Sequence, residues 1–347
     1  MANLTIQKIG LETFPPIVTD FAQYLKSILA RSELTVCEYL LDIRTFLRFL
    51  CASDLRMNLY EEDLSKVDIS NVTIERLGAV DTDFLIKFVF YLDNNRDNSG
   101  TSKRRKVASL RAFFRYLHVK RRLIEKNPAI DLEAPKIKHG LPKYLSLNES
   151  VDLLKSIYYD ENSRNRQRDY AIVTLFLNCG MRLSELCGMN ITDIDREWEY
   201  ITVLGKGGKK RQVFLNDACR AALYPYMKIR LDGTPAKLQT DALFLSGRNQ
   251  RISNKTVQAM VYKYLDIAGL GNRGLSVHKL RHTAATLMYQ EGGVDVRVLQ
   301  ELLGHAQLNT TQIYTHVGSR SVRAAVQQNP LQSIKFNGRP KDDDTKI

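Results

Sequence analysis

The stretch "YITVLGKGGKKRQVFL", residues 200–215, differs in kind from the rest of this 347-residue chain. β-Branched and apolar residues flank a turn rich in glycine and lysine, which predicts a β-hairpin. The sequences on either side have the apolar spacing of helices, and no alternation of strands and helices indicates a Rossmann-like sheet. We therefore expect the second half of the chain to be helical with a small antiparallel sheet.

The first half of the chain is predicted to be helical from about residue 17 to residue 123. In "VTDFAQYLKSILARSELTVCEYLLDIRTFLRFL", apolar residues recur three and four positions apart, as on one face of a helix. Residues 54–81 are more polar and less periodic, which predicts a loop with short pieces of structure. The expected fold class is therefore mainly α, with a small antiparallel β-sheet in the second domain.

A proline-rich segment separates two predicted domains. "KNPAIDLEAPKIKHGLP", residues 126–142, holds three of the nine prolines, and a helix does not continue through them. A chain of this length is expected to form about two domains. We predict a helical first domain over residues 1–125, a linker, a second domain over residues 143–332, and a polar tail over residues 333–347.

The charge of the chain points to a polyanionic partner. Fifty-one Lys and Arg against 38 Asp and Glu leave a net charge of +13, which favours nucleic acid. A membrane is a weaker candidate, because apolar runs such as "FLIKFVFYL" end well short of the roughly 18 residues of a span. The N-terminal "MANLTIQKIG" lacks the pattern of a secretory signal, so we expect a cytoplasmic protein. Five cysteines without a C-x-x-C pair are expected to be reduced core residues.

One predicted helix is strongly basic. Residues 100–122 carry nine Lys and Arg and no acidic residue. Helical spacing turns Val107, Leu110, Phe114 and Leu117 toward a core and leaves a basic face, which is either simply solvated or in contact with DNA phosphates. We favour phosphate contact, and the candidate DNA-binding residues are Lys103, Arg104, Arg105, Lys106, Arg111 and Arg115.

Several chemically capable residues lie at predicted helix ends and turns. Arg182 follows Gly180, the expected stop of a helix, and could simply form an ion pair with Glu185. Lys206 lies in the hairpin turn "GKGGKKR", which does not fit the phosphate-loop pattern G-x-x-x-x-G-K-[ST].

A further helix, "VHKLRHTAATLMYQ", has Ser276 as its candidate N-cap, which places His278 and Arg281 near the helix start. His278 and His282 are four residues apart but lack the glutamate of H-E-x-x-H, so we expect no metal site.

The segment "LLGHAQLNTTQIYTHV", residues 302–317, combines a helix end, a turn and a new helix. Asp295 is expected to cap the helix "VRVLQELL", Gly304 ends it, and His305 follows directly. A capping-box variant begins the next helix, with Tyr314 on its second turn. The His305 and Tyr314 side chains are therefore expected to point toward one region.

A tyrosine, two arginines, two histidines and a lysine suit metal-free phosphoryl transfer. Guanidinium forks bind phosphate oxygens in pairs and stabilise charge that develops in the transition state. A tyrosine hydroxyl, with an ordinary pKa of about 10, needs a base or a cationic pocket to attack at neutral pH. A lysine can protonate the leaving sugar oxygen. Because a phosphotyrosine link conserves the bond energy, no cofactor or ATP is expected.

Four motifs, "GMRLSEL", "GKGGKKR", "HKLRHTAAT" and "LLGHAQLNTTQIYTHV", occur in this order and together resemble the tyrosine recombinase (phage integrase) family, most of all its bacterial Xer type. The resemblance covers most of the second domain. The first domain resembles the family only in its general architecture, that of a helical core-binding domain. It implies a two-domain DNA clamp, in which four protomers join two double-stranded core sites and recombine them through a Holliday junction.

The resemblance also implies a role for each catalytic position. Tyr314 would form a 3′-phosphotyrosine and release a 5′-hydroxyl, while Arg182 and Arg281 would hold the scissile phosphate. His278 would exchange a proton with the tyrosine, and Lys206 would be the general acid.

Two further residues and one segment take supporting roles by the same resemblance. His305 would hydrogen-bond the phosphate, and Glu185 would support the neighbouring arginine. Residues 318–334 would dock on a neighbouring protomer, and the tetramer could include a second recombinase or an accessory activator.

Chromosome dimer resolution is the expected role, and integration or excision of a mobile element with the same chemistry is the alternative. Two other classes of protein share part of this pattern: a DNA-binding regulator with an idle catalytic set, and a type IB topoisomerase, which relaxes supercoils without pairing sites. Residues 54–81 form a longer segment than a minimal Xer protein needs. We therefore expect the first domain either to recognise DNA differently or to contact its neighbour there.

Overall fold

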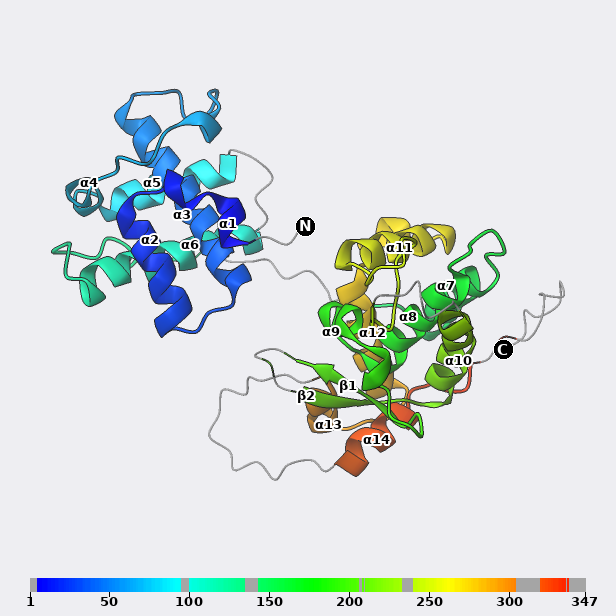
Figure 1. The fold of residues 1–347 in the computed structure, drawn as a ribbon. Helices are drawn as coiled ribbons and strands as arrows, with labels where there is room; N and C mark the ends of the chain where they lie inside the picture. Colours follow the sequence, from blue (N-terminus) through cyan, green and yellow to red (C-terminus); the bar gives the residue numbers. More distant parts are fainter. Residues whose placement is uncertain are drawn as a thin grey trace. The chain divides into compact units, whose positions relative to one another are not determined.

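The computed structural model divides the chain into two compact units, Met1–Gly140 and Leu141–Ile347 (Figure 1). It describes residues 5–94, 100–134, 143–205, 208, 210–232, 240–303, 319–334 and 336. Helices dominate both units, and a single antiparallel pair of strands lies in the described part of the second. The predicted fold class is confirmed. No helix within the described ranges is long and apolar enough to cross a membrane.

The first unit is built around one long helix. Its helices are α1 Ile6–Ile9, α2 Pro16–Gln23, α3 Glu33–Asp54, α4 Ile74–Gly78, α5 Thr82–Asn94 and α6 Gly100–Arg115. The side chain of Ser32 caps α3 by accepting the Thr35 N–H at 3.3 Å. Phe46 of α3 is fully buried, with ring centroids of Phe88 and Phe114 5.4 and 5.8 Å away. Ala129 and Leu132 also pack into this core, beyond the last helix.

Residues 54–81 form a loop with two short helical pieces, as predicted. These are a 3₁₀ turn at Leu64–Lys66 and the helix α4. Arg76 Nε and Nη2 donate to the two carboxylate oxygens of Asp54, at 2.8 and 2.7 Å, which ties α4 to the end of α3. Leu64 and Ile69 are buried, so the loop is anchored by apolar side chains at several points.

The second unit surrounds a buried central helix, α8 (Figure 1). Its elements are α7 Leu147–Tyr158, α8 Arg166–Cys179, α9 Leu183–Gly188, β1 Tyr200–Leu204, β2 Lys210–Phe214, α10 Asp217–Asp232, α11 Asn254–Ile267, α12 Val277–Gln290, α13 Val296–Leu303 and α14 Ser319–Gln327. Helices α7, α10 and α12 pack around α8, whose residues are buried almost along its whole length. From Ala171 to Leu177 its residues are mostly apolar and all buried, as expected for a helix in the centre of a core.

The predicted hairpin is present. Strands β1 and β2 pair antiparallel, with Tyr200 opposite Phe214 and Leu204 opposite Lys210. Ile201 is buried on the core side of the sheet. The hairpin turn, which carries Lys206, lies outside the described residues.

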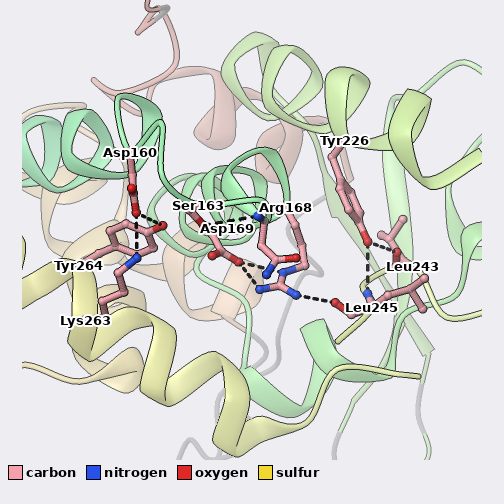
Figure 2. A network of polar contacts seen from close by, with 10 residues as sticks. Asp160, Ser163, Arg168, Asp169, Tyr226, Leu243, Leu245, Lys263 and Tyr264 are labelled. Atoms are coloured by element: carbon pink, nitrogen blue, oxygen red, sulfur yellow. Dashed lines mark hydrogen bonds and ion pairs between the residues drawn. The ribbon is translucent and has the colours of Figure 1, made fainter. Parts of the chain in front are cut away.

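Buried polar contacts hold the start of α8 in place (Figure 2). Arg168 Nε donates to Asp169 Oδ1 at 2.8 Å, and Arg168 Nη1 donates to the carbonyl of Leu245 at 2.7 Å. The Tyr226 hydroxyl of α10 donates to the carbonyl of Leu243 at 2.9 Å. These contacts tie α8 and α10 to the segment around residue 244. They fix the N-terminal end of α8, and the helix then carries the chain to Gly180 at its C-terminal end.

The C-terminal segment packs on its own unit. Val322 and Val326 of α14 are buried against α12 and α13 residues. Asn329 Nδ2 donates to the carbonyl of Leu177 at 2.9 Å, and Leu331 is fully buried in the main core. Residues 319–334 are therefore part of the second unit, and their predicted docking on a neighbouring protomer stays a prediction.

Candidate active site

The end of α8 approaches the end of α13 closely. Gly180 has φ +57° and donates its N–H to the carbonyl of Phe176 at 3.1 Å, so it ends α8 as predicted. A Cβ at this position would lie 2.9 Å from Leu303 Cδ2. The positive φ and this close approach both favour glycine, and the contact brings the chain at Arg182 beside the last turn of α13.

Arg182 and Glu185 form a tight local pair at the start of α9. The Arg182 backbone N–H donates to Glu185 Oε2 at 2.7 Å, and its Nη1 donates to Oε1 at 2.8 Å. The Glu185 side chain is 1% exposed and that of Arg182 is 31% exposed. The carboxylate is thus fixed and hidden, while the guanidinium keeps an open side.

A third residue, Arg211 of β2, completes this cluster. Its Nη2 and Nε donate to the two Glu185 oxygens at 2.9 and 3.3 Å, and its Nη1 donates to the carbonyl of Leu302 at 2.6 Å. Burial alone would raise the pKa of Glu185, but hydrogen bonds and charge from Arg211, together with Arg182, hold it below its ordinary value. Arg211, the last residue of "GKGGKKR", was not predicted as a site residue; the signal for it was a basic residue that a short turn places opposite Val203 in the hairpin.

Arg281 reaches the same end of α13 from α12. It is 5% exposed, and its Nη2 donates to the carbonyl of Leu303. Its Nη1 is buried without a hydrogen-bond acceptor among the described residues. Burial first, and then the charge of Arg182, lower the pKa of Arg281 to about 10. A desolvated guanidinium with an unused N–H beside a second arginine is suited to an anion.

His278 lies one turn before Arg281 on the same helix. Burial, followed by the charges of Arg281 and Lys279, lowers its pKa below the ordinary value. The helix starts at Val277, as predicted, but the Ser276 side chain makes no capping hydrogen bond to any described residue. Ser276 is the N-cap residue, as predicted, and its backbone carbonyl accepts the first helical hydrogen bonds.

The last predicted residues follow directly on α13. Asp295 caps this helix by accepting the Arg297 N–H at 2.7 Å, as predicted. His305 and Tyr314 lie outside the described residues, as does Lys206. The structure therefore brings together Arg182, Glu185, Arg211 and Arg281, with His278 near enough to feel the charges of Arg281 and Arg182. Arg211 and Arg281 contact the last turn of α13, the helix that precedes His305 in the sequence.

The basic helix of the first unit divides into two sets of side chains. Arg105 Nη1 and Lys106 Nζ bind Asp42, at 2.6 and 3.2 Å, and the Asp42 side chain is 1% exposed. Burial raises the pKa of Asp42 against the opposing effect of Lys106. Lys103 forms an ion pair with Asp93.

By contrast, Arg104, Arg111 and Arg115 are exposed at intervals of seven and four residues, on one face of α6. Val107, Leu110, Phe114 and Leu117 are buried, as predicted. DNA contact by the six candidates stays a prediction, and the exposed arginines are its best-placed members.

In the described residues, a mostly helical fold with a β-hairpin gathers Arg182 and Arg211 around a buried carboxylate, which is an arrangement suited to an enzyme that binds an anionic substrate. Residues 143–320 match the phage integrase family, and the chain belongs to that family. It is a tyrosine recombinase of the Xer-like type, so the expected family and enzyme class are confirmed.

Two relatives and two solved structures illustrate the likeness. The chain is 46% identical to tyrosine recombinase XerC of Caldanaerobacter subterraneus subsp. tengcongensis, over 92% of this chain and 88% of the relative. It is 33% identical to XerC of Corynebacterium efficiens, over 90% of each.

A post-cleavage complex of XerH site-specific recombinase with a palindromic difH substrate aligns with TM-score 0.62 and 25% identity, over 89% of this chain and 82% of that one. A lambda integrase dimer on a COC′ core site shares the fold, with TM-score 0.61 and 17% identity over 94% and 79%.

Proposed function

We propose that this chain cleaves and rejoins DNA strands at specific sites through a 3′-phosphotyrosine and a Holliday junction, without metal or ATP, and resolves chromosome dimers. The observation that carries the proposal is the convergence of Arg182 and Arg281 at the end of α13. Arg281 keeps a buried N–H without an acceptor among the described residues, and Arg182 is partly open. Together they offer a phosphodiester the donors that its transition state requires.

In the proposed reaction, Tyr314 Oη attacks the scissile phosphorus and forms the new P–O bond, while the bond to the 5′ sugar oxygen breaks. Lys206 gives that oxygen its proton, and His278 takes the proton of the tyrosine. Its lowered pKa supports this role, because a neutral imidazole can accept a proton at neutral pH. His305 hydrogen-bonds a phosphate oxygen. Attack of another 5′-hydroxyl on the phosphotyrosine reverses the step and needs no ATP.

Within this proposal Arg211 is a positioning residue. It holds the Glu185 carboxylate, which in turn orients Arg182, and it holds the carbonyl of Leu302. It thereby links three parts of the site: the hairpin that carries Lys206, the arginine at the start of α9, and the base of the segment that carries the tyrosine.

The proposed partners are double-stranded core sites and three further recombinase subunits, acting in the cytoplasm. A solved lambda integrase tetramer on a Holliday junction shares the fold, with TM-score 0.58. The C-terminal segment would join the protomers, and a second recombinase or an accessory activator could take part. The alternative role is recombination of a mobile element. The position of the cleavage sites distinguishes the two roles: cleavage at one chromosomal locus indicates dimer resolution, and cleavage at the ends of an element indicates its mobilisation.

The test uses duplex fragments of the host genome, nicked so that the short 5′-hydroxyl strand diffuses away after cleavage. We expect the intact protein to form an adduct that survives denaturing electrophoresis, and Tyr314→Phe to bind the same fragments without an adduct. Tight, salt-sensitive binding without an adduct on any fragment would instead identify a DNA-binding regulator. Relaxation of a supercoiled plasmid that lacks the mapped site would identify a topoisomerase.

A further inference from the structure

A polar pocket of about 330 Å³ lies in the first unit, and none of its lining residues is among the proposed active-site residues. Residues of α3 and of the segment around Ile9 and Thr13 form two of its walls, and residues 65–69 form the third. The third wall belongs to the long segment between α3 and α5. Two arginines of α3, Arg44 and Arg48, line the pocket one helical turn apart.

Each of the two arginines has one nitrogen whose hydrogen-bond donor is not used within the described residues. Arg44 Nε and Arg48 Nε are buried and have no acceptor among the described residues. The rest of the Arg44 guanidinium is held in place, because Nη2 donates to the carbonyl of Ile9 and the group lies 4.7 Å from the centre of the Phe14 ring. A buried donor without an acceptor costs about 1–3 kcal/mol, so negative charge beside either guanidinium group would be stabilising.

The charge of the lining also favours an anion. Lys66 adds a third cation, against one carboxylate, Asp68. That carboxylate already accepts the N–H and the hydroxyl of Ser70, at 2.9 and 3.0 Å. Burial, and then the charge of Arg48, lower the pKa of Arg44 against the smaller opposing effect of the Glu12 carboxylate. An anion between the two guanidinium groups would relieve both effects.

We propose that this pocket binds a phosphate group of the DNA backbone. Arginine forks match phosphate oxygens in pairs, and Lys66 can act as an additional point charge. The proposal rests on the proposed function for its choice of DNA as the source of the phosphate. It also gives residues 54–81 a role, because they supply the wall that turns an arginine-bearing helix face into a pocket.

The experiment compares the salt dependence of duplex binding for the full-length protein and its variants. One duplex carries the mapped cleavage site and one is unrelated in sequence. We expect Arg48→Gln and Lys66→Gln to weaken both complexes by a similar factor, and each to reduce the slope of log K against log [salt] by about 0.9, the loss of one phosphate contact. The matched control is Arg56→Gln, which removes an exposed arginine of the same unit outside the pocket lining.

Two further measurements decide between outcomes. Circular dichroism shows whether Arg48→Gln is folded; Lys66 is exposed, so its variant keeps the test valid if Arg48→Gln is not. The proposal would be overturned if Arg48→Gln and Lys66→Gln both gave the same slope of log K against log [salt] as Arg56→Gln. Binding of inorganic phosphate that disappears in Arg48→Gln, with unchanged DNA slopes, would show a free-phosphate site and would also overturn the assignment to DNA.

Formation of the covalent protein–DNA adduct by the intact protein tests the proposed recombinase activity independently of the pocket proposal. If the adduct forms and the slopes do not change, the pocket proposal fails and the recombinase function stands. If no adduct forms, no cleavage site is mapped and the slopes are measured on the unrelated duplex alone; a fall of the expected size there supports the pocket proposal while the catalytic proposal fails.

Discussion

Glu185 and Arg211, 26 residues apart in the chain, are joined through both carboxylate oxygens, at 2.9 and 3.3 Å. The same two oxygens also accept hydrogen bonds from Arg182. One buried carboxylate therefore sets the positions of two guanidinium groups, of which Arg182 is proposed to touch the phosphate.

Arg211→Ala is expected to slow DNA cleavage about 100-fold, because displacement of a catalytic group by roughly 1 Å can cost that much. It should also lower the free energy of unfolding by about 1–3 kcal/mol, since Glu185 loses buried donors. Single-turnover cleavage of the nicked duplex at saturating DNA gives the rate, and filter binding gives the affinity.

Arg211→Lys provides the matched comparison, because it keeps the charge but not the fork. It should recover stability more fully than rate. A positioning role would be excluded if Arg211→Ala weakened DNA binding and left the rate at saturation unchanged.

The cleavage rate should depend on the protonation of His278. Its lowered pKa keeps the imidazole neutral above about pH 6.5, so cleavage should be independent of this group from there to pH 8 and should fall as the solution is acidified through the pKa. Rates at DNA concentrations far below saturation report the free enzyme.

In His278→Asn the rate should be low and the acidic fall should disappear. His282→Asn is the control, because His282 is exposed on the same helix and its Nδ1 pairs with Thr286 Oγ1 at 2.9 Å. An acidic fall that persists in His278→Asn would assign it to another group.

Gly180→Ala should destabilise the protein by about 1–2 kcal/mol, because φ +57° is unfavourable for alanine. The added methyl would also press on Leu303, next to the carbonyl that Arg281 binds. Urea unfolding measures the change. Gly188→Ala is the control, since a Cβ there meets nothing within 4 Å, and equal losses in the two variants would contradict the argument.

The arginines and lysines of α6 should separate into two functional sets. Arg111→Gln is expected to reduce the salt slope of DNA binding by about 0.9 without changing stability, because its side chain is exposed. Lys106→Gln should instead reduce stability by about 1–3 kcal/mol, because buried Asp42 loses a cation. Unfolding curves and DNA titrations of both variants make the comparison, and a reversed pattern would refute it.

Local sequence alone determined much of this protein. Apolar spacing specified the helices, the glycine and lysine turn specified the hairpin, and Gly180 and Asp295 marked helix ends, because each of these depends on neighbours within a few residues. The order of four short motifs was enough to indicate the family.

Tertiary structure decided which side chains meet. Arg211 contacts the carbonyl of Leu302, 91 residues away, and Arg105 contacts Asp42, 63 residues away. Helical spacing could place Arg105 near a basic face, but only the packing of α3 against α6 turned it toward a buried carboxylate. Likewise, the pairing of Arg211 depends on how α9, the hairpin and α13 pack. Such contacts follow from the shape of a filled core, which spacing along the chain does not encode.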